Sequence, residues 1–189
     1  MKIDVVVPKN NGAELLAMAI KLGFKEIIFL YNQVKEKPTN PNSDEIKVYT
    51  AGLINNMNDL DKARRNYDFV FAPANRAFFE NKHIKYLINA EADSRDELLY
   101  QKRAGLDDIM CRVAKEKNKV VVFNTSLLAQ DKNKDKNRNN MNIFGRMQQN
   151  ARLCRKYRVE TLIVTFASTP FEMRTPKDLD GFARALKLL

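Results

Sequence analysis

Seven short runs of apolar, β-branched or aromatic residues recur at fairly even spacing, and they constrain the fold more than any other feature of the sequence. The runs are Val5–Val7, Ile27–Leu30, Lys47–Tyr49, Phe69–Phe71, Tyr86–Ile88, Val120–Phe123 and Leu162–Val164. Continuous apolar runs, as opposed to alternating apolar and polar residues, are typical of strands buried on both faces of a parallel sheet. The sequence therefore predicts about seven parallel strands.

Helical patterns lie between these runs. Leu15, Leu16, Ala19 and Ile20 share one helix face, and Gly23 follows as a C-terminal stop. Strands that alternate with helices indicate an α/β fold.

Three further helix signals lie in the second half of the chain. Residues 94–97 have the sequence of a capping box, and residues 175–178 offer an N-cap followed by proline and an acid. The apolar stripes predicted to face the core are Leu106, Ile109, Met110 and Val113 in one helix, and Leu179, Phe182, Ala183 and Leu186 in the last.

The length of 189 residues limits the architecture. Seven strands fit either a (β/α) barrel or an open doubly wound sheet, and a full eightfold barrel takes at least ~200 residues. We predict a TIM-barrel-like α/β fold, a trimmed or irregular barrel with about seven strands, as a single domain over 1–189. The glycine-rich phosphate motifs of dinucleotide and P-loop proteins are absent from the sequence.

The formal net charge of +10 favours a polyanionic partner, nucleic acid first and an anionic membrane surface second. The chain contains 20 Lys and 20 Asn, a composition typical of AT-rich codon usage, so solvated lysines carry little functional information. The 13 Arg are better candidates, because a guanidinium also binds phosphate bidentately.

Positive charge is densest over residues 131–158, which hold nine Lys or Arg against two Asp. Residues 129–142 have almost no apolar side chains, so we predict a mobile Lys/Asn-rich surface loop there. If 143–157 form a helix, Arg152 and Arg155 lie opposite its apolar face and Arg146 lies at the margin. A basic loop leading to an arginine-rich helix suits RNA or phosphate, although a solvated helix face explains the same pattern.

Three more arginines stand at predicted strand-to-helix connections, where α/β folds carry functional groups. The predicted RNA-binding residues are therefore Arg76, Arg103, Arg146, Arg152, Arg155 and Arg174.

No catalytic constellation stands out. The single histidine, His83, excludes multi-histidine metal sites built from this chain alone. The two cysteines, Cys111 and Cys154, fall on apolar helix faces, fit a reducing cytoplasm and lack metal-ligand spacing. We predict no catalytic and no metal-binding residues, no bound cofactor, no membrane span and a cytoplasmic location.

Several motifs together resemble one family. Asn75-Arg76-Ala77 after a strand, Arg103-Ala104-Gly105-Leu106 before a helix, the segment from Arg146 through Asn150 to Arg155-Lys156-Tyr157, and Arg174-Thr175-Pro176-Lys177-Asp178-Leu179 occur in register. This set is similar to that of ribonuclease P protein component 3, the archaeal and eukaryotic thirty-kilodalton subunit family, and the resemblance covers nearly the whole chain.

The resemblance implies a TIM-barrel-like relative of the polymerase and histidinol phosphatase superfamily that lacks the clustered metal-binding histidines. It implies a protein subunit that stabilises ribonuclease P RNA, which itself removes the 5′ leader of precursor tRNA with Mg²⁺. The implied partners are that RNA, precursor tRNA, a Pop5-type protein subunit and the other ribonuclease P proteins, and the protein alone is expected to be inactive.

Two other functions remain open from the residues. Asp4, Asp68 and Asp93 could converge at one barrel end and hold Mg²⁺, as in a metal-dependent phosphoesterase of the same superfamily. Alternatively, a basic barrel could bind a phosphorylated metabolite.

Overall fold

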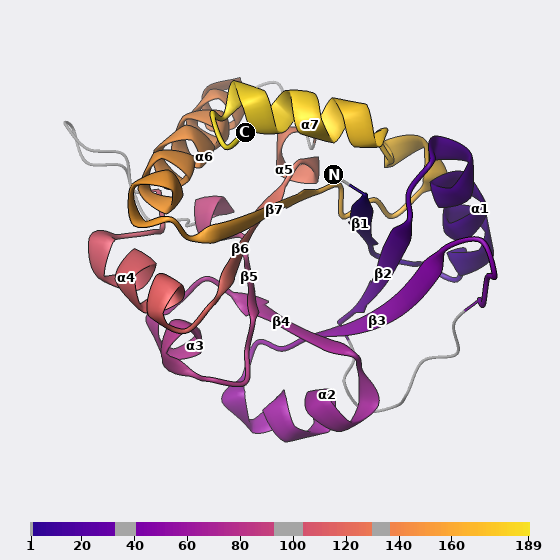
Figure 1. Ribbon diagram of the computed structural model, residues 1–189, viewed down its shortest axis with the longest axis horizontal. Helices are drawn as coiled ribbons and strands as arrows, with labels where there is room; N and C mark the ends of the chain where they lie inside the picture. The colour runs from indigo at the N-terminus through magenta and orange to yellow at the C-terminus, as the bar shows by residue number, and fades with distance from the viewer. Residues whose placement is uncertain (1, 33–40, 93–103, 130–136) are drawn as a thin grey trace.

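Seven parallel strands form a nearly closed ring, with the helices packed around its outside (Figure 1). The computed structural model describes residues 2–32, 41–92, 104–129 and 137–189. The strands are β1 (Ile3–Val6), β2 (Glu26–Tyr31), β3 (Lys47–Leu53), β4 (Phe69–Pro73), β5 (Tyr86–Ile88), β6 (Val120–Asn124) and β7 (Glu160–Val164). All seven predicted strands are confirmed, as is the TIM-barrel-like α/β fold.

In the described chain, one or more helices follow every strand except β2. They are α1 (Gly12–Leu22), η1 (Met57–Asp59), α2 (Leu60–Asn66), α3 (Arg76–Glu80), η2 (Ala90–Ala92), α4 (Asp108–Glu116), α5 (Ser126–Ala129), α6 (Asn137–Tyr157), η4 (Pro170–Glu172) and α7 (Pro176–Ala185). Each strand pairs in parallel with the next in sequence, so the chain winds once around the barrel.

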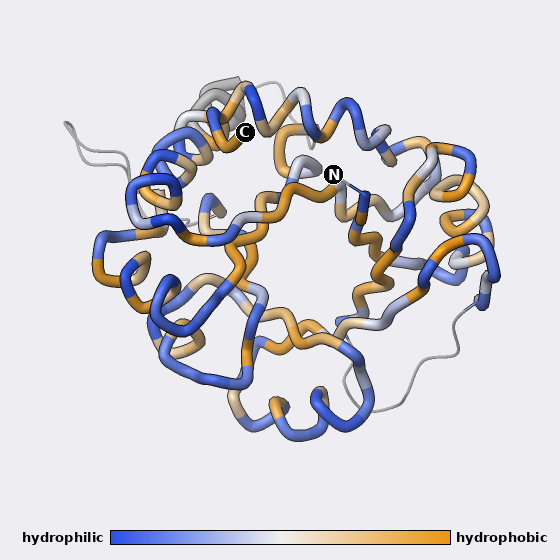
Figure 2. Tube along the Cα trace, viewed as in Figure 1, coloured by the Kyte–Doolittle hydropathy of each residue, from blue (hydrophilic) through white to orange (hydrophobic). Residues whose placement is uncertain are grey.

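Alternation along the strands divides the core into two layers. Val5 points into the barrel with Ile28, Phe71 and Val122, whereas its neighbour Val6 packs outward beneath the helices. Both layers are apolar, and most of the ring of strands is orange in Figure 2, with blue or pale stretches chiefly along β3 and at the starts of β2 and β7. Burial on both faces explains the continuous apolar runs of the sequence.

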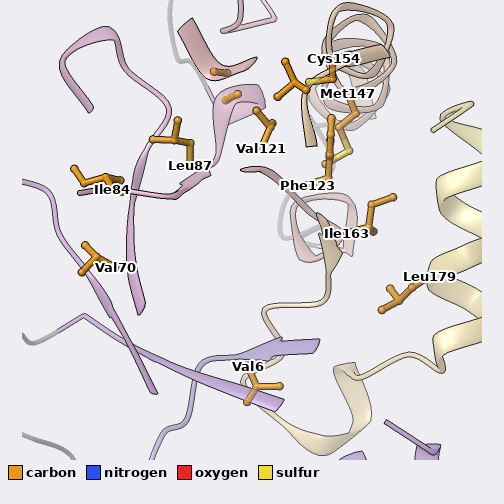
Figure 3. Packing of buried hydrophobic residues seen from close by; sticks show 14 of the residues in the cluster. Val6, Val70, Ile84, Leu87, Val121, Phe123, Met147, Cys154, Ile163 and Leu179 are labelled. Atoms are coloured by element: carbon orange, nitrogen blue, oxygen red, sulfur yellow. The ribbon is translucent and has the colours of Figure 1, made fainter. Parts of the chain in front are cut away.

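The outer layer binds the largest helix to the sheet. Phe123 of β6 and Ile163 of β7 lie beneath α6, whose Met147 and Cys154 point inward (Figure 3). All four side chains are fully buried, and the second cysteine, Cys111 of α4, is buried as well. The predicted placement of both cysteines on apolar helix faces is confirmed.

Capping residues fix two helices where the sequence predicted them. Gly23 ends α1 in the left-handed conformation, with φ at 83°. At α7, Thr175 and Asp178 form reciprocal capping bonds around Pro176. The predicted capping box at 94–97 lies outside the described residues.

Two predicted helices differ from the structure. Asp107 caps α4, so Leu106 precedes the helix, and Ile109 is 57% exposed; the buried face consists of Met110, Cys111 and Ala114. Helix α6 begins at Asn137, so 137–142 are helical and not part of the predicted loop. Once a helix is formed, each further residue adds a hydrogen bond at little cost, which explains how the helix extends through a polar stretch. Residues 130–136 lie outside the described residues.

The barrel closes between β1 and β7 through a narrow seam. The only β-bridge between them in the described chain joins Val6 to Ala167, and the Val7 amide donates to the Ala167 carbonyl at 2.8 Å. Asp4, fully buried on the outer face of β1, accepts hydrogen bonds from the Thr165 amide at 2.8 Å and hydroxyl at 2.7 Å. At this seam, the Asp4 carboxylate therefore accepts hydrogen bonds in place of the backbone carbonyls that pair the other neighbouring strands.

Burial leaves Asp4 with a pKa of about 6, above its ordinary 3.8, because desolvation outweighs the hydrogen bonds from Thr165 and Val5. The folded protein therefore holds an extra proton between those pH values. The free energy of unfolding should fall as the pH rises from about 4 to about 6, by on the order of 3 kcal/mol from this group. Asp4→Asn, which cannot titrate, should remove that component, and urea unfolding across this pH range measures it. Identical pH profiles for the two proteins would contradict the prediction.

Candidate nucleic-acid interface

A cavity of about 780 Å³ opens at the carboxyl ends of the strands, and we call it the barrel mouth. Parallel (β/α) barrels place their functional sites at this end, because the loops that leave the strands converge there. Four strands, β2, β3, β5 and β6, contribute to its walls, together with the segments that follow β1 and β7 and the start of α7. Its lining is Val7, Lys9, Leu30, Asn32, Leu53, Ile88, Asn89, Asn124, Thr125, Ser126, Leu128, Thr165, Phe166, Ser168, Glu172, Arg174, Asp178, Leu179 and Phe182.

Asparagines stand at the ends of three strands in this lining. Asn32 follows β2, Asn89 follows β5 and Asn124 ends β6. The Asn124 amide donates to Asn89 Oδ1 at 3.4 Å, and its Oδ1 accepts from the Ser126 amide and hydroxyl. Asn89 has φ of 57°, a conformation that asparagine tolerates better than most residues. The mouth therefore presents amide groups where a metalloenzyme would carry ligands.

Four charged residues line the mouth, and both acids are already engaged. Glu172 Oε2 accepts from the Ser168 amide at 2.6 Å and the Thr169 amide at 3.2 Å, and the bond from the Ser168 backbone lowers the pKa of Glu172. Asp178 Oδ2 accepts from Thr175 at the cap of α7. Lys9 and Arg174 supply the positive charge, and the Arg174 guanidinium donates to the carbonyls of Phe171 and Met173.

The carboxylates considered for Mg²⁺ do not come together. Asp4 points outward from the barrel and is buried against Thr165. Asp68 precedes β4, at the amino end of that strand, and binds the Thr50 amide and hydroxyl. Asp93 lies outside the described residues. Within the described ranges, no group of three His, Cys, Asp or Glu side chains is placed to hold a metal ion.

A buried polar cluster anchors α6 to the loops that follow β5. The Asn150 amide donates to Glu91 Oε1 at 3.1 Å and to the Ala104 carbonyl at 2.6 Å, while Arg146 donates to the Glu91 carbonyl at 3.2 Å. Both Glu91 and Asn150 are fully buried. Desolvation raises the pKa of Glu91 to about 7, so a protonated carboxyl is accessible near neutral pH.

Gly105 lies beside this cluster, at a position where the backbone leaves no room for a side chain. Its φ is 91°, and a Cβ there would lie 1.8 Å from the Ala90 carbonyl oxygen. The Arg-Ala-Gly-Leu motif therefore includes a glycine that the close backbone approach requires.

The predicted RNA-binding arginines that the structure describes lie in different surroundings. Arg76 is the first residue of α3, is exposed and pairs with Glu80 at 3.0 Å. Arg174 lies at the mouth, and Arg146 is half-buried against η2. Arg103 lies outside the described residues.

The remaining two arginines lie on the outer face of α6. Arg152 and Arg155 are exposed, and Arg155 donates to the Lys187 carbonyl at 2.8 Å. This end of α6 leads into the amino end of β7, whereas Arg174 follows the carboxyl end of β7. The five predicted residues that the structure describes therefore do not share one compact site, and contact of the predicted residues with RNA stays a prediction.

Sequence analysis missed two sets of residues that the structure brings together. Glu91 gave no signal, because a glutamate between two alanines is ordinarily a surface residue. The mouth asparagines did carry a signal, since each stands where a predicted strand ends. The abundance of asparagine in the chain concealed it.

None of the helices in the described part of the chain has the length and apolar character of a membrane span.

The chain is similar to curated proteins named ribonuclease P protein component 3. It is 27% identical over 143 residues to the one from Methanococcus vannielii, covering 71% of this chain and 57% of that protein. It is 25% identical over 153 residues to one from Methanococcus maripaludis, covering 75% of this chain and 61% of that protein. The resemblance expected from the sequence motifs is confirmed. The chain spans about three fifths of the length of these relatives, and no family model matches it.

Solved structures agree on the fold. A chain in the cryo-EM structure of archaeal ribonuclease P with mature tRNA superposes with a TM-score of 0.73 at 18% identity, covering 98% of this chain and 82% of that one. Histidinol phosphate phosphatase from Lactococcus lactis, complexed with zinc, L-histidinol and phosphate, gives 0.59 at 11% identity, covering 98% and 92%. The same barrel thus occurs in a ribonucleoprotein and in a phosphatase, and the residues of the site must decide between them.

Gly105→Ala should destabilise the protein by about 2 kcal/mol or more, because the added methyl meets the Ala90 carbonyl and φ is positive. Gly181→Ala is the matched control: it lies within α7 with open space around its Cβ position, so it should leave stability unchanged or raise it by up to about 1 kcal/mol. Thermal unfolding of the three proteins measures both effects. Equal stabilities for the two variants would show that the Gly105 contact is dispensable.

Proposed function

We propose that this chain acts as a protein subunit of ribonuclease P. In this role it binds and stabilises the RNA subunit, which removes the 5′ leader of precursor tRNA with Mg²⁺ held by the RNA. The similarity to ribonuclease P protein component 3 carries the proposal. The net charge of +10 supports it, because neutralising phosphates is the main source of affinity in RNA binding.

The chemistry of the mouth supports a scaffolding role over a hydrolytic one. The two acids in its lining serve as hydrogen-bond acceptors for nearby backbone and hydroxyl groups, and asparagines occupy the strand ends. Nothing among the described residues forms the ligand set that a phosphoesterase of this fold would use. The metal-dependent phosphoesterase alternative therefore lacks support from any group of residues in the described chain.

The proposed partners follow from the same assignment. They are ribonuclease P RNA, precursor tRNA, a Pop5-type protein subunit and the other proteins of the particle. The exposed basic face of α6, with Arg152 and Arg155, is the surface that we assign to RNA.

Reconstitution tests the proposal. Added to the cognate RNA and the other protein subunits, the chain should raise cleavage of precursor tRNA or lower the Mg²⁺ concentration that cleavage requires. The protein alone should not cleave. Robust cleavage by the RNA-free protein, lost when EDTA removes divalent metal, would overturn the proposal in favour of a metal-dependent hydrolase.

Alanine variants of the exposed arginines test the contact surface. Arg152→Ala removes a side chain with no partner among the described residues, so it should change stability by no more than about 0.5 kcal/mol. If it contacts a phosphate, the slope of log binding constant against log salt should fall by about 0.7–0.9. Binding to the cognate RNA at several salt concentrations measures this slope.

A triple variant of Lys132, Lys134 and Lys136 to alanine is the control for the arginine variants. We attribute these lysines to codon usage, so the triple variant should leave the salt slope unchanged. A slope that responds to the lysine variant and not to Arg152→Ala or Arg155→Ala would show that the RNA surface is assigned to the wrong residues.

A further inference from the structure

We propose that the barrel mouth binds a single unpaired nucleotide of RNA, with the base inside the cavity and its phosphate at the rim. The inference rests on the proposed function, since that function brings RNA to this protein, and it adds a binding site with its own chemistry. The cavity volume of about 780 Å³ is within the range of small-ligand sites and exceeds the needs of an inorganic ion.

The floor of the mouth suits the flat faces of a base. Leu30, Leu53, Ile88 and Phe166 come from four strands or their ends and point into the barrel, where they close its interior beneath the cavity. RNA-binding proteins recognise unstacked bases by covering their faces with apolar or aromatic side chains and by hydrogen bonding to their edges. An apolar floor provides the first of these requirements.

The amides of the wall supply the second requirement. Asn32 has no hydrogen-bond partner among the described residues, and Asn89 uses only its oxygen, to accept from Asn124. Each side-chain amide offers donors and an acceptor side by side, which matches the alternating donors and acceptors at the edge of a base. Around these amides, the side chains of Asn124, Ser126 and Glu172 are already hydrogen-bonded within the protein.

Charge distinguishes a nucleotide from a free polyanion. The cations Lys9 and Arg174 are balanced by Glu172 and Asp178, so the lining has no net charge to hold a di- or triphosphate. Arg174 donates to the Phe171 and Met173 carbonyls through one guanidinium nitrogen, which leaves its other N–H groups without a partner in the described chain. These free N–H groups can bind a single phosphate at the rim of the mouth.

The RNA-free, full-length protein is the material for the test. Its binding to the four nucleoside 5′-monophosphates, to ribose 5-phosphate and to inorganic phosphate is measured by NMR titration or calorimetry. At least one nucleoside monophosphate should bind at least about tenfold more tightly than ribose 5-phosphate, because the base contributes most of the contacts. If ribose 5-phosphate bound as tightly as every nucleoside monophosphate, the mouth would be an anion site only and the proposal would be overturned. The absence of nucleotide binding at about 10 mM would overturn it as well.

Asn32→Leu should weaken nucleotide binding at least about fivefold, because it removes an unpaired amide from the wall. Asn42→Leu is the matched control: Asn42 is equally exposed but lies at the opposite end of the barrel, beside the start of β2 and β3, and should have no effect. Both positions are exposed, so thermal midpoints should match that of the parent protein. Unchanged binding in Asn32→Leu would overturn the placement of the base.

The nucleotide titration and the cleavage assay fail independently. Nucleotide binding with no stimulation of the reconstituted particle would refute the proposed function and leave the mouth site standing. Stimulation without nucleotide binding would refute the mouth site alone.

Discussion

Closure of the barrel depends on hydrogen bonds between the first strand and the residues that follow the last. In the described chain, β1 forms one bridge across this seam, from Val6 to Ala167 beyond the end of β7, where other neighbouring strands share a regular ladder. Asp4 compensates by binding the amide and hydroxyl of Thr165 inside a dry layer. A buried carboxyl is costly unless it is well bonded, so its position here indicates that the seam has few other sources of stability.

The seam also positions the functional end of the molecule. Thr165 begins the segment that carries Phe166 and Ser168 into the mouth and then enters η4 and α7. A barrel left open at this point would release one wall of the cavity, including Arg174. Barrel stability and the geometry of the mouth are therefore physically linked.

The sequence predicted what depends on periodicity and local chemistry. Seven apolar runs gave seven strands, and the Thr-Pro-Lys-Asp segment gave the start of α7, because each signal lies within a few neighbouring residues. Ile109 was misplaced because helical spacing defines a buried stripe only when the first helical residue is known. Asp107 is the N-cap, so α4 begins at Asp108, two residues after Leu106. The onset of α6 was placed too late for a related reason: polar asparagines do not show whether a helix extends through them.

Sites that form only in three dimensions could not be predicted in this way. Glu91 becomes a buried hydrogen-bond partner because α6 brings Asn150 to it from 59 residues away. The three mouth asparagines converge because parallel strands end at the same rim, which requires the strand order and register to be known. The arginines differ from these residues. Sequence motifs and helix spacing singled them out as one set, but the structure places those it describes apart, on α3, on α6 and at the mouth.

That distribution has a physical consequence for RNA recognition. Arginines on separate elements can each neutralise a phosphate, and such contacts orient an RNA without reading its sequence. A cavity that accepts a base reads the nucleotide itself and needs that base to be unstacked. In the role that we propose, the two kinds of contact are complementary: the basic surface would supply affinity that depends on salt, and the mouth would fix a position along the RNA. The described residues hold no metal-ligand set, but the parallel strands still gather polar groups at one rim, and we propose that this rim serves RNA recognition.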